Sequence, residues 1–245
     1  MKRLLFIFLF ALALLGRQTY ADTLITGTFG SSRTPTVTIG YAFSFSQDVL
    51  ITDVGIYDST GSGLTPTNML GIWTDSGSLL ASKSFDPTVS PVLDGHFRWL
   101  SLESPLHLYS NARYRVGTFG SEPGLLGSVA PSSLPTNVTF IAEVGSGSGS
   151  FTFPQSTTLR TSGTAYIGPN LRYIPIPTLQ FIQNPGSDFT MSWPTNASGF
   201  VLESASSLLT SNWDAVTNGI VTVADQYVVE VNATNSQSFF RLHYQ

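Results

Sequence analysis

Phe189-Thr190-Met191-Ser192-Trp193 decides the fold, because apolar and polar residues alternate along it without interruption. Successive side chains of a β-strand point to opposite faces of a sheet, so this pattern predicts a strand with one buried face. Three further stretches share the period of two: Asp53-Val54-Gly55-Ile56, Arg113-Tyr114-Arg115-Val116 and Phe200-Val201-Leu202-Glu203. The spacing that predicts an amphipathic helix is not convincing anywhere after residue 21. The chain is therefore predicted to be all-β.

Turn-forming residues separate the predicted strands at short intervals. The clearest of these breaks are Asp58-Ser59-Thr60-Gly61-Ser62-Gly63, Asp75-Ser76-Gly77, Asp86-Pro87 and Leu93-Asp94-Gly95. Many short strands with frequent turns are typical of an antiparallel sandwich or a jelly roll. We therefore expect a jelly-roll-like antiparallel β-sandwich as the main architecture.

A proline pair marks the predicted domain boundary. Ile174-Pro175-Ile176-Pro177-Thr178 holds two alternate prolines, which cannot donate to a strand ladder and favour an extended spacer. We therefore predict a first domain over residues 22–173, a linker over residues 174–178 and a second domain over residues 179–245. The Gly/Ser run at residues 145–150 is a rival linker. We interpret it as a flexible loop inside the first domain, because strand-like Phe151-Thr152-Phe153 follows it.

Residues 1–21 have the pattern of a secretory signal peptide. A basic start precedes an unbroken apolar run over residues 4–15, and Thr19-Tyr20-Ala21 then offers small residues at a cleavage site. The alternative, a retained membrane anchor, is disfavoured because a spanning helix needs about 20 apolar residues. We predict cleavage between Ala21 and Asp22, and a mature protein that is secreted to the extracellular space or the outer cell envelope.

The charge balance argues against nucleic acid and membrane partners. Removing Lys2, Arg3 and Arg17 with the signal leaves 8 basic against 15 acidic residues, a net charge of −7 with Lys83 as the remaining lysine. Phosphate backbones and anionic headgroups both require clustered cations. We therefore expect no nucleic-acid partner, and no membrane association after cleavage.

Composition indicates a folded, exported protein without thiol chemistry. Charged residues make up 11% of the chain and hydrophobic residues 42%, which favours a packed core over disorder. Cysteine is absent, so cysteine catalysis and cysteine-ligated metals are excluded. A cysteine-free exported chain of this length fits a bacterial protein better than an animal one.

Several short segments follow one another in a recognisable order through the first predicted domain. They are Gly40-Tyr41-Ala42-Phe43, Val54-Gly55-Ile56-Tyr57-Asp58, Gly71-Ile72-Trp73, Gly77-Ser78-Leu79-Leu80-Ala81-Ser82, Tyr114-Arg115-Val116-Gly117 and Tyr166-Ile167-Gly168-Pro169-Asn170-Leu171. This order, over about residues 24–173, resembles an uncharacterised exported bacterial domain often found ahead of a PEP-CTERM sorting tail. The resemblance implies a β-sandwich in a surface or matrix setting, and it brings no known catalytic residues.

The second predicted domain resembles a truncated fibronectin type III or immunoglobulin-like module. The resemblance rests on Met191-Ser192-Trp193, Phe200-Val201-Leu202-Glu203-Ser204, Leu208 or Leu209 with Trp213, and Phe239-Phe240-Arg241-Leu242. It implies a small immunoglobulin-like sandwich, in which Trp193 and Trp213 are core residues by pattern. The chain lacks a Pro-Glu-Pro sorting signal, so processing by a sorting enzyme is not expected.

Ionisable residues form no recognisable catalytic or metal-binding pattern. No Gly-x-Ser-x-Gly elbow accompanies the three histidines, His96, His107 and His243. Four aspartates are predicted at strand ends or turns, where they could gather as calcium ligands: Asp53, Asp58, Asp75 and Asp94. The preferred interpretation is that each forms hydrogen bonds with its own backbone. A glycosidase needs two carboxylates across a cleft, and nothing selects a pair among Glu103, Glu122 and Glu143. We predict no catalytic residue, metal or cofactor.

Two aromatic residues are candidates for ligand binding. If Val54 and Ile56 face the core, Tyr57 points to the other face of its strand, and by the same reasoning Trp73 points away from Ile72. Exposed rings on neighbouring strands could form a platform for sugar rings. The preferred alternative is that both sheet faces are covered, because large aromatic residues are mostly buried. Trp73 and Trp99 would then be core residues.

Taken together, these patterns favour an exported, non-catalytic structural or adhesive protein of the bacterial envelope or extracellular matrix. A carbohydrate-binding module is the alternative, and a secreted polysaccharide hydrolase is a distant third. The partners expected are extracellular glycans or other envelope proteins.

Overall fold

The structure, a computed structural model, is all-β in the part of the chain that it describes. No helix is found among these residues, and none of them therefore belongs to a helix that could cross a membrane. The predicted all-β class is confirmed. The described residues are 21–26, 32–33, 36–58, 61–64, 67–86, 88, 91–120, 126–129, 134–158, 165–166, 168–184, 188–197, 199–209, 212–232 and 237–245.

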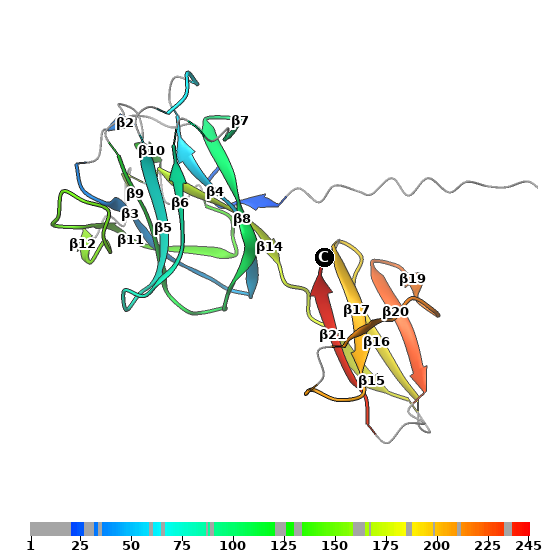
Figure 1. The fold of residues 1–245 in the computed structure, drawn as a ribbon. Coiled ribbons are helices and arrows are strands. Elements are labelled where there is room, and N and C mark those ends of the chain that lie inside the picture. The colour runs from blue at the N-terminus through cyan, green and yellow to red at the C-terminus, as the bar shows by residue number, and fades with distance from the viewer. Residues whose placement is uncertain are drawn as a thin grey trace, which may run out of the picture. The chain divides into compact units, whose positions relative to one another are not determined.

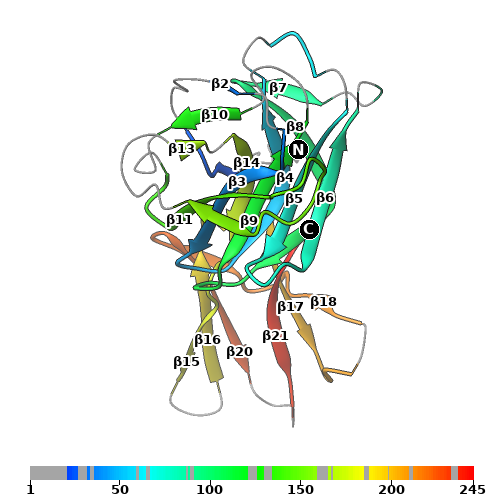
Figure 2. The same ribbon diagram turned by 90° about the vertical axis from the view of Figure 1, so that its left-hand side faces the viewer.

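The described chain divides into two compact units, residues 21–177 and residues 178–245. Figures 1 and 2 show that each unit is built from antiparallel sheets. The first unit contains a five-stranded sheet in the order β1-β14-β4-β8-β7 and a six-stranded sheet in the order β12-β11-β3-β9-β5-β6.

The strand bounds of the first unit are as follows. The five-stranded sheet consists of β1 (Asp22–Thr23), β14 (Pro169–Pro175), β4 (Val49–Tyr57), β8 (Phe97–Leu108) and β7 (Val92–Asp94). The six-stranded sheet consists of β12 (Ser156–Thr158), β11 (Val138–Gly145), β3 (Ile39–Phe45), β9 (Tyr114–Phe119), β5 (Asn68–Thr74) and β6 (Leu79–Phe85). A small third sheet consists of β13 (Ala165–Tyr166), β10 (Leu126–Val129) and β2 (Ser32–Arg33).

One hydrophobic core lies between the two large sheets, so the first unit is a β-sandwich. On β3, every second residue is a fully buried aromatic ring: Tyr41, Phe43 and Phe45. The Phe45 ring packs 4.8 Å from the ring of Tyr173 on the opposite sheet, and the Tyr41 hydroxyl donates to the carbonyl of Pro169 at 3.1 Å. Alternation along β3 therefore gives the sandwich both its apolar interior and a specific contact between the sheets.

A buried asparagine fixes the N-terminal strand to the five-stranded sheet. The Asn170 side-chain oxygen accepts hydrogen bonds from the backbone N–H of Ile25 and Leu171 at 3.0 and 2.9 Å, and its amide nitrogen donates to the Ile25 carbonyl at 3.0 Å. The Leu24 N–H also donates to the Leu171 carbonyl. Because Asn170 is fully buried, these bonds satisfy polar atoms that water does not reach.

The start of the predicted linker is part of a strand of the first unit, and the Gly/Ser run lies in a loop of the same unit. Ile174 and Pro175 belong to β14, where Ile174 is buried opposite Leu50 and the Ile176 N–H donates to the Asp48 carbonyl. The missing N–H of Pro175 is tolerated at the last residue of the strand. Residues 145–150 form a loop held against the chain by hydrogen bonds to Thr38.

The second unit is a smaller two-sheet arrangement. Its four-stranded sheet has the order β15-β16-β20-β19 and its three-stranded sheet the order β18-β17-β21. The strands are β15 (Gln180–Gln183), β16 (Asp188–Pro194), β20 (Gln226–Asn232), β19 (Val221–Val223), β18 (Asp214–Ala215), β17 (Phe200–Ala205) and β21 (Phe239–Tyr244). Met191 and Trp193 of the fold-deciding stretch are buried with Leu202 and Val229. Trp213, in contrast, is half-buried, with the Arg241 guanidinium 4.1 Å above its ring.

Candidate functional site

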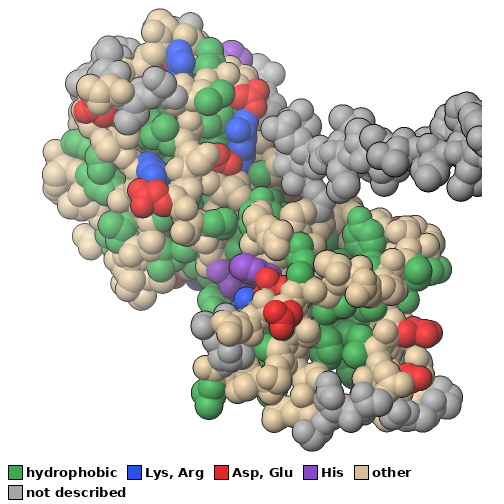
Figure 3. All heavy atoms as spheres, turned by 45° about the vertical axis from the view of Figure 1, so that its right-hand side comes forward, with side chains coloured by type: hydrophobic (Ala, Val, Ile, Leu, Met, Phe, Trp, Pro, Cys, Tyr) green, Lys and Arg blue, Asp and Glu red, His purple; other side chains and the backbone are tan. Residues whose placement is uncertain are grey.

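Figure 3 shows charged side chains scattered over one face, among hydrophobic side chains, uncharged polar side chains and backbone. Arginines are tied to acidic partners at several places. Arg115 bonds to Asp75 at 2.8 Å, and Arg98 bonds to Asp58 at 2.9 Å. A ligand site on this surface therefore needs polar groups that border a hollow.

Tyr57 and Trp73 lie on the sheet faces that alternation predicts, yet other residues cover both rings. Ile56 and Ile72 belong to the main core, whereas Tyr57 packs on Phe97 outside it. Trp73 is 3% exposed, with the rings of Phe151 and Phe153 at 5.4 and 6.4 Å. The structure thus favours the alternative that these rings are buried, and neither offers an open platform.

A second aromatic cluster covers the outer face of the five-stranded sheet. It consists of Tyr57, Phe97 and Trp99. Trp99 is 4% exposed and lies flat against Gly55, where a Cβ atom would come within 2.8 Å of the indole ring. Glycine at position 55 is therefore needed for this close approach.

Arg172 lies over the ring of Trp99. Its guanidinium lies 4.2 Å from the indole centroid and forms a close ion pair with the Asp94 carboxylate. The Trp99 indole N–H in turn donates to the Asp94 carbonyl at 3.4 Å. An arginine held flat on an aromatic ring and paired with a carboxylate is a fixed, charged hydrogen-bonding group.

A pocket of about 200 Å³ opens beside this group. β1, β14 and β8 supply its walls, and the hairpin between β7 and β8, with Gly95 at φ +61°, supplies its rim. Asp94 and His96 are exposed, whereas Phe97 and Trp99 are buried beneath them. The complete lining is Thr23, Ile25, Thr26, Asp94, Gly95, His96, Phe97, Trp99 and Arg172.

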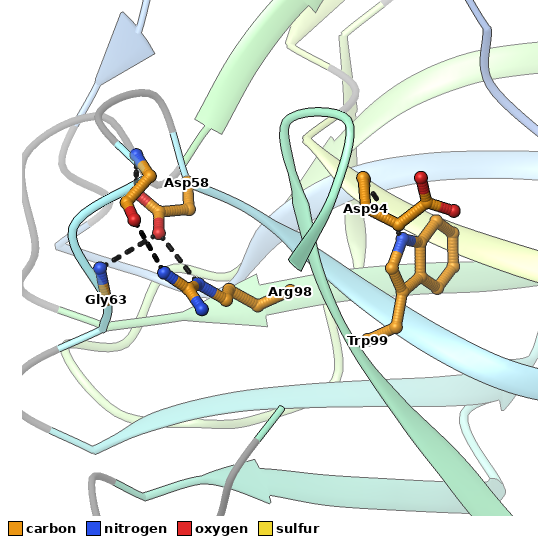
Figure 4. Close-up of polar contacts among 6 residues, drawn as sticks. Asp58, Gly63, Asp94, Arg98 and Trp99 are labelled. Atoms are coloured by element: carbon orange, nitrogen blue, oxygen red, sulfur yellow. Dashed lines mark hydrogen bonds and ion pairs between the residues drawn. The ribbon is translucent and has the colours of Figure 1, made fainter. Parts of the chain in front are cut away.

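Asp58 organises a structural loop next to this hairpin. Its carboxylate accepts from the backbone N–H of Gly61 and Gly63 at 2.8 and 3.1 Å and from Arg98 Nε at 2.9 Å. Figure 4 shows Arg98 and Trp99, neighbours on β8, pointing in opposite directions, one to this loop and the other to Asp94. Asp58 therefore binds its own backbone, as its turn position predicts.

The remaining sequence candidates do not converge. Asp53 bonds to Thr52 and Ser101, and Asp75 to Arg115. Among the described residues, no group of three histidine or acidic side chains has the arrangement of a metal site. Glu103 pairs with Lys83 at 3.5 Å, Glu143 is 7% exposed, and Glu122 lies outside the described residues.

Two of the three histidines are paired with carboxylates. Asp48 accepts from the Ser110 N–H at 2.8 Å, which holds the pKa of Asp48 below its ordinary value, and its bond with His107 at 3.0 Å acts in the same direction. Burial alone raises the pKa of Glu203. Hydrogen bonds with Arg241 and His243 outweigh this effect and hold that pKa below its ordinary value. Both carboxylates are thereby stabilised as anions.

The pocket residues were not selected by the sequence as a site. Asp94 and Arg172 are 78 residues apart, and no local pattern connects them. The available signal was the alternation around Arg172, which places its side chain on the opposite face from buried Leu171.

The predicted cleavage point lies next to the site. Asp22 begins β1 directly after Ala21, and residues 1–20 lie outside the described residues.

Comparison with known families gives one match. Residues 25–127 match the family described as Domain of unknown function (DUF4082). This segment includes β3 to β9 and, with them, the hairpin that carries Asp94, His96 and Trp99. No curated protein matches the chain.

Proposed function

We propose that this chain is an exported, non-catalytic structural or adhesive protein of the bacterial envelope or extracellular matrix. The proposal keeps the resemblance of the first unit to exported domains found ahead of PEP-CTERM tails, and of the second to fibronectin type III or immunoglobulin-like modules. Secretion after cleavage at Ala21 is part of the proposal. The jelly-roll description of the sandwich also stays a prediction.

The observation that carries the proposal is that acidic side chains are paired with arginines. Asp58, Asp75 and Glu203 each bind an arginine at 2.8–2.9 Å. Hydrogen bonds with Arg241 and His243 hold the pKa of Glu203 below its ordinary value, so this carboxylate is poorly suited to deliver a proton near neutral pH. Each pair also joins strands or loops that are 38 to 40 residues apart in the chain, which is a structural task.

The test has a biochemical and a cellular part. Purified residues 22–245 should release no soluble sugar from a panel of polysaccharides. Deleting the gene in its host should reduce surface attachment or envelope integrity, and the wild-type gene should restore it. Turnover that disappears in Glu143→Gln, but persists in the exposed control Glu103→Gln, would instead support the hydrolase. A deletion strain with unchanged attachment and envelope would contradict the structural or adhesive role.

Carbohydrate binding is the second candidate, and one observation favours it. The pocket beside Trp99 joins buried aromatic side chains to exposed polar groups, a composition common in small-ligand sites. This observation moves the candidate site from Tyr57 and Trp73 to the pocket.

A further inference from the structure

The pocket beside Trp99 presents hydrogen-bond donors and acceptors within one small hollow. Arg172 contributes guanidinium N–H groups and Asp94 contributes carboxylate oxygens, while Thr23, Thr26 and His96 can each act in both senses. Arg172 keeps 23% of its side chain exposed and Asp94 keeps 65% exposed. Both members of the ion pair are therefore accessible to a ligand while they remain paired.

Apolar side chains complete the pocket lining. Ile25, Phe97 and Trp99 are at most 5% exposed, so they are packed into the protein and change little when a ligand binds. Trp99 is held by the close approach of Gly55 and by the guanidinium of Arg172 over its ring. Its role is to position Arg172, because an indole that is 4% exposed is not open for stacking.

We propose that this pocket binds one sugar unit of a neutral extracellular glycan, an inference that rests on the adhesive role proposed above and names its ligand. Two neighbouring hydroxyl groups of a sugar match the Asp94–Arg172 pair. One hydroxyl donates to the Asp94 carboxylate, and its neighbour accepts from the Arg172 guanidinium. The ion pair stays intact in this arrangement, so binding does not require the separation of two charges.

Other ligand classes fit the same groups less well. A carboxylate or phosphate that accepted from Arg172 would lie beside the negative charge of Asp94, which repels it. A cation drawn to Asp94 would meet the positive charge of Arg172. The volume of about 200 Å³ is below the range of about 300–1,000 Å³ that is usual for drug-sized ligands. A single uncharged sugar ring fits both the paired charges of Asp94 and Arg172 and the volume of the pocket.

Titration of residues 22–245 with simple sugars tests the site directly. The probes are methyl β-glucoside, methyl α-mannoside and methyl β-galactoside, with sodium glucuronate as the charged comparison. The reporter is the NMR resonance of the Trp99 indole N–H, assigned by its loss in Trp99→Phe. At least one neutral glycoside should shift it, with a Kd of about 1 mM because the pocket is small. Glucuronate should bind at least several-fold more weakly. The inference is wrong if none of the neutral glycosides shifts this resonance, or if glucuronate binds more tightly than all of them.

A matched pair of variants shows whether the sugar binds in this pocket. Asp94→Ala should weaken binding by about tenfold or more, because Arg172 loses its partner and the sugar loses its acceptor. Asp75→Ala is the control: Asp75 pairs with Arg115, which lies over the Phe153 ring at 4.9 Å in a similar arrangement. Binding should change less than about twofold in this variant. Equal affinities in the two variants would overturn the inference. Asp94→Asn, which preserves the shape, serves as a second variant and should weaken binding several-fold.

The cellular assay separates this inference from the proposed function. The Asp94→Ala gene should fail to restore attachment to the deletion strain, whereas the Asp75→Ala gene should restore it. If both genes restore attachment, the pocket does not serve attachment and the structural role stands. If deletion itself has no effect, the structural or adhesive role fails, while the titration still decides whether the pocket binds sugar.

Discussion

The Asp58 carboxylate accepts hydrogen bonds from Gly61, Gly63 and Arg98, and its side chain is 3% exposed. Glycine suits the loop because Gly61 and Gly63 have φ values of +68° and +110°, which other residues rarely adopt. The carboxylate thus satisfies backbone N–H groups of the loop and the charge of Arg98 at once.

Replacing Asp58 should therefore destabilise the first unit strongly. Asp58→Ala leaves the largely buried Arg98 charge and two backbone N–H groups without this partner, and we expect a loss of about 3 kcal/mol in the free energy of unfolding. Urea denaturation followed by tryptophan fluorescence measures it. Glu103→Ala, at a side chain that is 95% exposed, is the control and should leave the midpoint unchanged. Similar midpoints for the two variants would show that the Asp58 network contributes little.

Buried tyrosines predict a loss of stability at alkaline pH. Burial raises the pKa of Tyr173 to about 12, although its hydrogen bond to Asn137 acts in the opposite direction, and burial raises the pKa of Tyr41 as well. An unfolded tyrosine has a pKa of about 10, so folding favours the neutral phenol. The resulting stability is fully present below pH 10 and is lost as the pH rises towards 12.

Urea midpoints measured between pH 8 and pH 12 test this expectation. Tyr173 should account for about 2–3 kcal/mol of the loss, since one pKa unit corresponds to about 1.4 kcal/mol. Tyr173→Phe should flatten the alkaline fall, whereas Tyr109→Phe, at a ring that is 61% exposed, should not. An unchanged slope in Tyr173→Phe would contradict the assignment.

The loop at residues 145–150 shows how one residue orders a flexible sequence. The Thr38 hydroxyl donates to the Ser150 carbonyl at 3.2 Å and accepts from the Thr152 N–H at 2.9 Å, while the Thr38 N–H donates to the Ser146 hydroxyl at 3.0 Å. Thr38 itself is fully buried. An alternating Gly/Ser sequence is thereby held in place between β11 and β12 by a residue more than 100 positions earlier.

Removing the Thr38 hydroxyl should loosen this loop. Thr38→Val keeps the side-chain shape but deletes two hydrogen bonds, so we expect a loss of about 1–2 kcal/mol and faster amide exchange at Thr152. Hydrogen-exchange NMR and urea denaturation measure the two effects. Thr139→Val, at an exposed position on β11, is the matched control and should be close to neutral. Unchanged exchange at Thr152 would show that other contacts hold the loop.

Strands were predictable because one-sided burial is a local property of the sequence. Met191 and Trp193 are buried on β16, as their alternation with Thr190 and Ser192 predicts. Trp213 was predicted as core and is half-buried, because it lies on a loop beside β18 where the period of two does not apply.

The residues that pack over the outer face of a strand were not predictable, because they are distant in the sequence. Alternation placed Trp73 on the correct face, but Phe151 and Phe153, almost 80 residues later, bury it. The pocket depends in the same way on Arg172 meeting Asp94. Sequence periodicity therefore identifies the face that a ring occupies and gives no information about the residues that cover that face.

On the scale of the whole molecule, the two units should fold independently. They are separate compact units, each with its own core. We expect residues 22–177 and residues 178–245 to give two soluble, β-rich products with separate melting transitions. A fragment of residues 22–168 serves as the control and should not fold, because it lacks β14, which pairs with both β1 and β4. Failure of both complete fragments to fold would contradict the division.

The pairing of β1 with β14 joins the first and last described strands of the first unit. The hydrogen bonds that fix Ile25 join it to Asn170, 145 residues later in the chain. At synthesis rates of about 5–20 residues per second, the N-terminal strand must wait roughly 7–30 s for this partner. During that interval Leu24 and Ile25, which are fully buried in the finished protein, have no sheet to cover them. A chaperone that keeps an exported chain extended therefore has an apolar binding segment at Leu24 and Ile25 for as long as Asn170 is not in place.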